Sequence, residues 1–136
     1  MASYSIADMR AVGPFYAGKL KAVGVRSTTK LLERTRTPRD RRQLADAAVI
    51  PLEHILRWAK LADLMRIRGV AEDYAELLGA AGADTVKELA RRNAARLVAR
   101  MAELNDKKKR VDLLPSEKRV VRWIEEAKSL EPMITY

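Results

Sequence analysis

Residues 9–32 read MRAVGPFYAGKLKAVGVRSTTKLL, and residues 67–90 read IRGVAEDYAELLGAAGADTVKELA. At a shift of 58 positions, the two stretches share 8 identical residues out of 24. In both, a tight turn of small residues is followed by a short apolar segment that ends at a glycine. Self-similarity of this kind at a fixed shift is typical of a duplicated structural unit. The sequence therefore predicts a tandem repeat.

The repeat continues beyond these stretches, because residues 57–58 and 122–123 are both Arg-Trp. Their shift of 65 positions is longer than the shift of 58 at the start of the repeat. We predict copy one at about 6–60, copy two at about 61–130, and a short tail at 131–136.

Copy two carries six or seven more residues than copy one. The extra residues fall most simply at about 105–110, a segment with four consecutive basic side chains at its end. Like charges repel, and copy one folds without such a segment. We therefore expect a mobile, dispensable loop here.

Start and stop signals predict helices throughout both copies. Pro14 suits a first helical turn, and Gly24 and Gly82 suit the left-handed residue that ends a helix. Ser27 in copy one and Asp84 in copy two are candidate caps for the next short helix. The expected helices cover residues 14–23, 71–81, 38–48, 52–66, 94–108 and 116–129, together with a short helix after each capping residue.

No stretch alternates apolar and polar residues over the length of a strand. The 21 Ala and 16 Leu residues outnumber the 16 Val and Ile residues, which favours helix over strand. We expect an all-α protein. It should form a single domain over 1–136, in which two pseudo-symmetric copies share one core because the helix 52–66 belongs to both.

Composition excludes several classes of protein. The 136 residues carry a net charge of +9 and no cysteine, so disulfides and cysteine-ligated zinc are excluded. No apolar run approaches the length of a membrane span. The first residues have neither the basic nor the apolar region of a secretory signal, so a cytoplasmic protein without membrane contact is expected.

Catalytic motifs are missing from the sequence. His54 is the only histidine, and without a partner cluster it is expected to be a surface or helix-capping residue. No nucleophile elbow, phosphate loop or metal-ligand spacing occurs. We predict a protein that is not an enzyme and uses no cofactor or metal. Trp58 and Trp123 lie among apolar residues and are expected in the core.

The two turns resemble the helix-hairpin-helix motif, whose pattern is apolar-x-Gly-apolar-Gly-x-x-x-Ala-x-x-Leu. The segments 9–20 and 67–78 each follow it, with Ala11 in place of the first glycine of copy one and Ala71 in place of the second glycine of copy two. Taken whole, the chain resembles an uncharacterised bacterial family of tandem helix-hairpin-helix proteins, a domain of unknown function.

This resemblance implies binding of a nucleic-acid backbone without recognition of sequence. In such a hairpin, turn amides and a helix N-terminus attract phosphate, and nearby Lys and Arg release counterions. Residues 1–60 hold 12 basic and 5 acidic side chains, whereas residues 61–136 hold 15 and 13, which favours the first hairpin. The amides of Val12 and Gly13 are the expected phosphate donors. The candidate DNA- or RNA-binding residues are Arg10, Ala11, Val12, Gly13, Lys19, Lys21 and Arg26.

A basic run at residues 34–42 is as consistent with a solvated helix face as with an extension of this surface. The alternative function is a module for protein–protein interaction or self-association that binds no nucleic acid. The acids Glu72, Asp73, Glu76 and Asp84 follow the second turn and favour that alternative. The sequence leaves both functions open.

Overall fold

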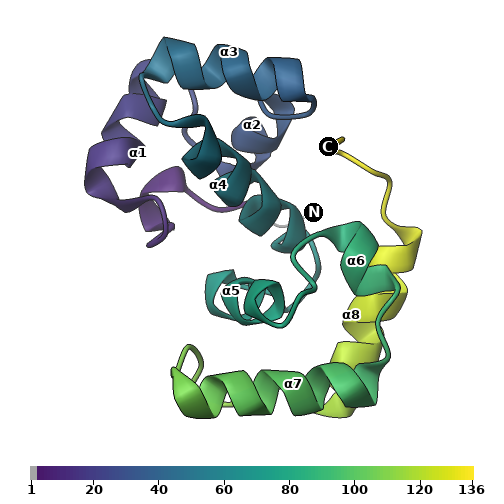
Figure 1. Cartoon of the computed structure of the whole chain (residues 1–136). Coiled ribbons are helices and arrows are strands. Elements are labelled where there is room, and N and C mark those ends of the chain that lie inside the picture. Colours follow the sequence, from purple (N-terminus) through teal and green to yellow (C-terminus); the bar gives the residue numbers. More distant parts are fainter. Residues whose placement is uncertain (1–2) are drawn as a thin grey trace. The chain divides into compact units, whose positions relative to one another are not determined.

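A computed structural model describes residues 3–136, and the regular elements of this part of the chain are helical (Figure 1). The prediction of an all-α fold is confirmed. A single isolated bridge pairs Ser5 with Ser27. The elements are η1 (Ile6–Asp8), a 3-10 helix, and the α-helices α1 (Gly13–Ala22), α2 (Thr28–Glu33), α3 (Pro38–Ala48), α4 (Leu52–Leu64), α5 (Glu72–Ala80), α6 (Val86–Ala90), α7 (Ala94–Lys107) and α8 (Glu117–Ser129).

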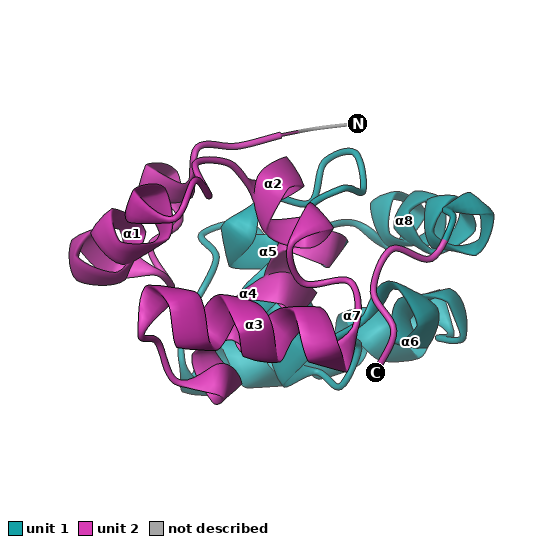
Figure 2. Cartoon of the chain, turned by 90° about the horizontal axis from the view of Figure 1, so that it is seen from above, with its two compact units in different colours: residues 1, 64–131 teal, residues 2–63, 132–136 magenta. Residues whose placement is uncertain are grey.

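The described residues form two compact units, coloured separately in Figure 2. Unit 2 contains residues 3–63 and 132–136, and unit 1 contains residues 64–131. The boundary falls at the last residue of α4, close to the predicted division between the copies. The C-terminal tail belongs to unit 2, although it follows unit 1 in the sequence.

The end of α1 in unit 2 is a glycine-terminated helix cap. Gly24 has a φ of 87°, and the amide of Val25 donates to the carbonyl of Leu20 at 2.9 Å. Positive φ is accessible to glycine without steric cost, so the chain turns sharply here. Ser27 then accepts a hydrogen bond from the amide of Lys30 and caps α2, as predicted.

In unit 1, α5 ends in the same way, at residues 58 positions further along the chain. Gly82 has a φ of 92°, and the amide of Ala83 donates to the carbonyl of Leu78 at 2.9 Å. The cap of α6 is Thr85, whose hydroxyl accepts from the amide of Glu88 at 3.0 Å. The prediction of Asp84 as the cap is wrong, since Thr85 is the extended residue whose side chain reaches the amide three positions on.

The two turns before α1 and α5 differ in backbone conformation. In unit 2 the left-handed residue is Gly13, with a φ of 76°. In unit 1 it is Gly69, with a φ of 88°, while Ala71 is extended at a φ of −86°. Gly69 corresponds to Ala11 in the repeat, so the left-handed position has moved by two residues. Each turn therefore keeps a glycine where its own backbone needs one.

Each tryptophan lies in the core of its own unit, which confirms the predicted burial. Trp58 is 1% exposed and Trp123 is 3% exposed. The Trp58 ring lies 5.3 Å from that of Tyr16, and the Trp123 ring lies 5.4 Å from that of Tyr74. Tilted aromatic pairs at these distances add to the stabilisation that burial provides.

The tail at residues 132–136 packs against unit 2. The amide of Thr135 donates to the carbonyl of Arg36 at 2.8 Å, and Ile134 is buried. The guanidinium of Arg41 donates to the carbonyls of Thr35 and Thr135, both at 2.8 Å. Burial lowers the pKa of Arg41 below its ordinary value. These backbone contacts fix the tail in place.

The insertion in copy two is an organised turn. The side-chain oxygen of Asn105 accepts from the amides of Arg110 and Val111, and its nitrogen donates to the carbonyl of Val111. Val111 is 5% exposed. The expected mobile loop is thus an ordered segment, which Asn105 and Val111 hold while its lysines are exposed. That the segment is dispensable stays a prediction.

Candidate nucleic-acid interface

The predicted binding residues fall into two groups along α1. Arg10 and Gly13 belong to the turn at its N-terminal end, whereas Lys19 and Lys21 lie in its last turn. At 1.5 Å per residue, Lys19 is about 9 Å beyond Gly13 along the axis. Arg26 follows the helix, and its carbonyl accepts from the amide of Ile6 at 2.9 Å. The seven residues therefore do not encircle one turn.

The amides predicted to hold phosphate already have partners within the chain. Both Val12 and Gly13 donate to the carbonyl of Met9, at 3.1 and 3.3 Å. The carbonyl of Ala11 accepts from the indole of Trp58 at 3.1 Å. Pro14 has no amide hydrogen. Phe15 is therefore the remaining residue of the first turn, and helix geometry gives its amide no acceptor within the helix. A phosphate at this end of α1 would meet the Phe15 amide first.

The N-terminus of α1 has neither an acidic side chain in its first turn nor a side chain that caps it. The first turn of α5 contains Glu72 and Asp73. A helix N-terminus carries a partial positive charge, which acids in the first turn offset. Of the N-termini of α1 and α5, that of α1 is thus the more positive.

Lys19 connects α1 to the link between α3 and α4. Its ammonium donates to the carbonyl of Val49 at 3.0 Å and lies 4.9 Å from the centre of the Phe15 ring. Val49 is in the left-handed region, with a φ of 56°. Lys19 therefore stabilises the local structure as well as adding positive charge. Of the other two basic residues, Lys21 is half-buried and Arg26 is exposed.

The basic run at 34–42 is divided between structural and exposed side chains. Arg34 donates to the carbonyl of Val23 at 3.1 Å, at the end of α1, and Arg41 holds the tail. Arg36, Arg39 and Arg42 are exposed. This division could not be predicted from the sequence, because it depends on contacts with residues distant along the chain.

Two aromatic residues near α1 have surroundings that the sequence did not predict. His54 is half-buried, and its ring stacks on that of Trp58 with centres 5.8 Å apart, so it is a partly exposed residue that also packs on the core. Their spacing of four residues on one helix was a usable signal. Phe15 is 68% exposed beside the turn and was missed. Its repeat counterpart is Asp73, and this difference between the copies was a signal for Phe15.

The turn before α5 already binds a carboxylate of its own chain. The amide of Arg68 donates to the two carboxylate oxygens of Glu126 at 3.2 and 3.3 Å. Glu126 comes from α8 of the same unit. An anion approaching this turn would meet a negative charge, which disfavours phosphate binding.

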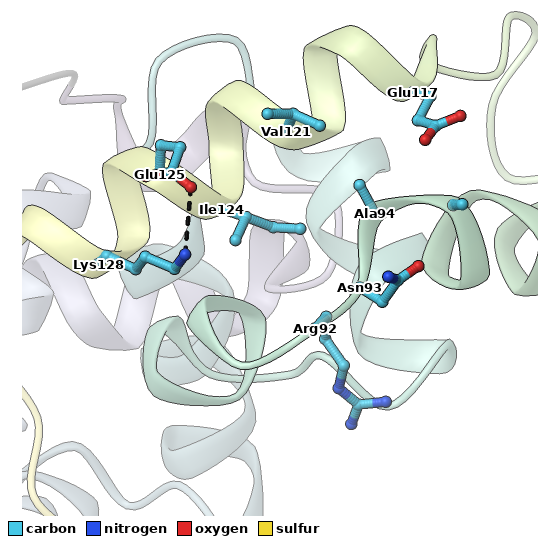
Figure 3. A pocket seen from close by; sticks show the side chains of 9 residues that line it. Arg92, Asn93, Ala94, Glu117, Val121, Ile124, Glu125 and Lys128 are labelled. Carbon is cyan, nitrogen blue, oxygen red and sulfur yellow. Dashed lines mark hydrogen bonds and ion pairs between the residues drawn. The ribbon is translucent and has the colours of Figure 1, made fainter.

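Unit 1 also has an open pocket of about 320 Å³ between the start of α7 and α8 (Figure 3). The side chains that line it include two acids and two bases, and Lys128 pairs with Glu125 at 3.1 Å. This mixture does not select for an anion. Over residues 3–136, no group of three His, Cys, Asp or Glu side chains is placed to hold a metal ion. Nor, over the same residues, is any helix long and apolar enough to cross a bilayer.

No curated protein matches this chain, and no solved structure does. A family described as "Domain of unknown function (DUF4332)" matches residues 10–130. The match begins after η1, ends just beyond α8 and includes the turns before α1 and α5. The chain therefore belongs to the DUF4332 family.

Proposed function

We propose that the two units are tandem helix-hairpin-helix copies and that the first hairpin binds the phosphate backbone of DNA or RNA without recognising sequence. In this proposal the protein acts by binding and is not an enzyme. The observation that carries it is the difference between the hairpins. The first helical turn of α1 contains no acid, whereas in the second hairpin the amide of Arg68 already donates to the carboxylate of Glu126.

Charge supports the same assignment. Residues 1–60 carry 12 basic and 5 acidic side chains, while residues 61–136 are nearly balanced at 15 and 13. Non-specific affinity for nucleic acid comes mostly from neutralised phosphates and released counterions. An excess of positive charge in one half of the chain favours that half as the binding surface.

The geometry suggests contact with more than one phosphate. The Phe15 amide and Arg10 lie at the N-terminal end of α1, and Lys21 lies in its last turn. Successive phosphates of one strand of duplex DNA are about 3.4 Å apart along its axis. The 10 residues of α1 span about 15 Å, so a basic track of that length along the DNA axis would reach about four of them.

The test is a binding titration against random-sequence duplex and single-stranded DNA at two salt concentrations. Lys21→Glu should weaken binding to both at low salt, because one cation of the proposed track becomes an anion. Lys118→Glu on α8 makes the same change of charge on unit 1, and it should have little effect. Equal effects of the two variants would show that only net charge matters and would contradict a site on the first hairpin.

The second candidate is a surface for protein–protein contact or self-association. Phe15, Val49 and Leu52 are exposed apolar residues of unit 2, at 68%, 72% and 44%. Exposed apolar patches often mark interaction sites. Failure of the wild-type protein to bind either nucleic acid, together with concentration-dependent self-association in sedimentation, would favour this candidate.

A further inference from the structure

We infer that Phe15 is a stacking platform for an unpaired base, so that the first hairpin prefers single-stranded to duplex nucleic acid. This inference rests on the proposed function and adds the class of nucleic acid to it. A ring that is 68% exposed lies directly beyond the turn where phosphate would bind. An exposed aromatic face beside a phosphate site is the arrangement on which an unpaired base can stack.

The ring is held in place although it is exposed. The Phe15 and Tyr16 rings form an edge-type pair with centres 5.2 Å apart, and Tyr16 packs in turn on Trp58. The Lys19 ammonium lies 4.9 Å from the Phe15 ring centre and is itself held by the Val49 carbonyl. A ring fixed by such neighbours loses little conformational entropy when a base stacks on it.

The position also combines the two features that single-strand binding proteins use. Successive bases stack on aromatic rings while basic side chains follow the backbone. Here the Phe15 ring, the Phe15 amide and the charge of Lys19 occur within one helical turn. In duplex DNA the faces of the bases are covered by their neighbours, so the ring would contribute only to binding of a single strand.

The repeat provides an internal comparison. Asp73 occupies the corresponding position of α5, where an acid in the first turn faces the same end of the helix. The aromatic ring occurs in the copy that has the basic surface and not in the copy whose turn binds Glu126.

The experiment measures dissociation constants of Phe15 variants for oligothymidine and for a random-sequence duplex of equal length. Phe15→Ala should weaken binding of the single strand by about 5- to 150-fold, the range for loss of one base–aromatic stack. Its effect on the duplex should be less than about twofold by the same reasoning. Phe15→Trp should retain single-strand binding, because the indole also offers a stacking face. Leu52→Ala, which removes another exposed apolar side chain of unit 2, is the matched control and should change neither affinity.

A second measurement reports stacking directly. An oligonucleotide with 2-aminopurine should change its fluorescence on binding the wild-type protein and Phe15→Trp, but not Phe15→Ala. Equal losses for single strand and duplex with Phe15→Ala, or no loss for either, would overturn the stacking role while leaving backbone binding intact. Absence of binding by the wild-type protein to both probes would instead refute the proposed function on which this inference rests.

Discussion

The indole of Trp58 donates a hydrogen bond to the carbonyl of Ala11 at 3.1 Å, and thereby fixes the first hairpin to α4. The partners are 47 positions apart in the sequence. A buried side chain that also satisfies a turn carbonyl stabilises both the core and the loop. The position of the candidate phosphate site therefore depends on this contact.

Truncation of Trp58 should be strongly destabilising. Trp58→Ala removes a ring that is 1% exposed and should lower the free energy of unfolding by about 3 to 5 kcal/mol. Trp58→Phe keeps most of the apolar contact but loses the hydrogen bond, and should cost less. Urea unfolding measures both. A loss below about 1 kcal/mol for Trp58→Ala, the level of an ordinary surface change, would show that the ring is not a core residue.

Asn105 should matter more to stability than its charged neighbours. Asn105→Ala removes the three hydrogen bonds that fix the insertion, and should cost about 1 to 3 kcal/mol, because turn amides lose their acceptor. Lys108→Ala in the same segment changes an exposed side chain and should stay within about 0.5 kcal/mol of the wild type. Thermal unfolding of both variants checks this. Equal stabilities would restore the idea of a dispensable loop.

The glycines of α1 should respond to alanine in opposite directions. Gly13→Ala places a side chain at a φ of 76° and should destabilise by about 1 to 2 kcal/mol, although nothing lies within 4 Å of the added carbon. Gly18 is inside the helix with equally open space, so Gly18→Ala should stabilise by about 0.5 to 1 kcal/mol. Denaturant titrations compare them. Stabilisation by both would mean that Gly13 is not left-handed in solution.

Glu126 should limit binding at the second hairpin. Glu126→Gln removes the negative charge of the side chain that accepts from the Arg68 amide. The variant should bind random-sequence DNA more strongly at low salt. Glu125→Gln makes the same change of charge on the same helix without touching the turn, which makes it the control. If both variants strengthen binding equally, net charge explains the effect and the occupied amide does not.

The sequence was sufficient for the helices, because glycine stops and hydroxyl caps are local signals. Gly24 and Gly82 end their helices as predicted, and Ser27 caps the next one. The cap at Thr85 was misassigned by one residue, since neighbouring Asp84 is an equally good capping type. Only the backbone conformation distinguishes the two.

The parts that the sequence did not predict depend on contacts between distant residues. Asn105 organises the insertion through backbone groups that appear only once the turn closes. Arg41 reaches the carbonyl of Thr135 across 94 positions. For the candidate site, charge and the hairpin pattern were visible in the sequence, but the partners of the Val12 and Gly13 amides were not. The left-handed residue of each turn could be placed only from the coordinates.

The salt dependence of DNA binding by the wild-type protein tests the central claim most directly. Neutralisation of about three to five phosphates predicts that log K falls with log salt at a slope of about −3 to −4.5 for random-sequence duplex DNA. The slope and affinity should be the same for unrelated sequences, because the proposed contacts are to the backbone alone. Absence of binding at low salt and micromolar protein, or an affinity that does not change with salt, would contradict the account.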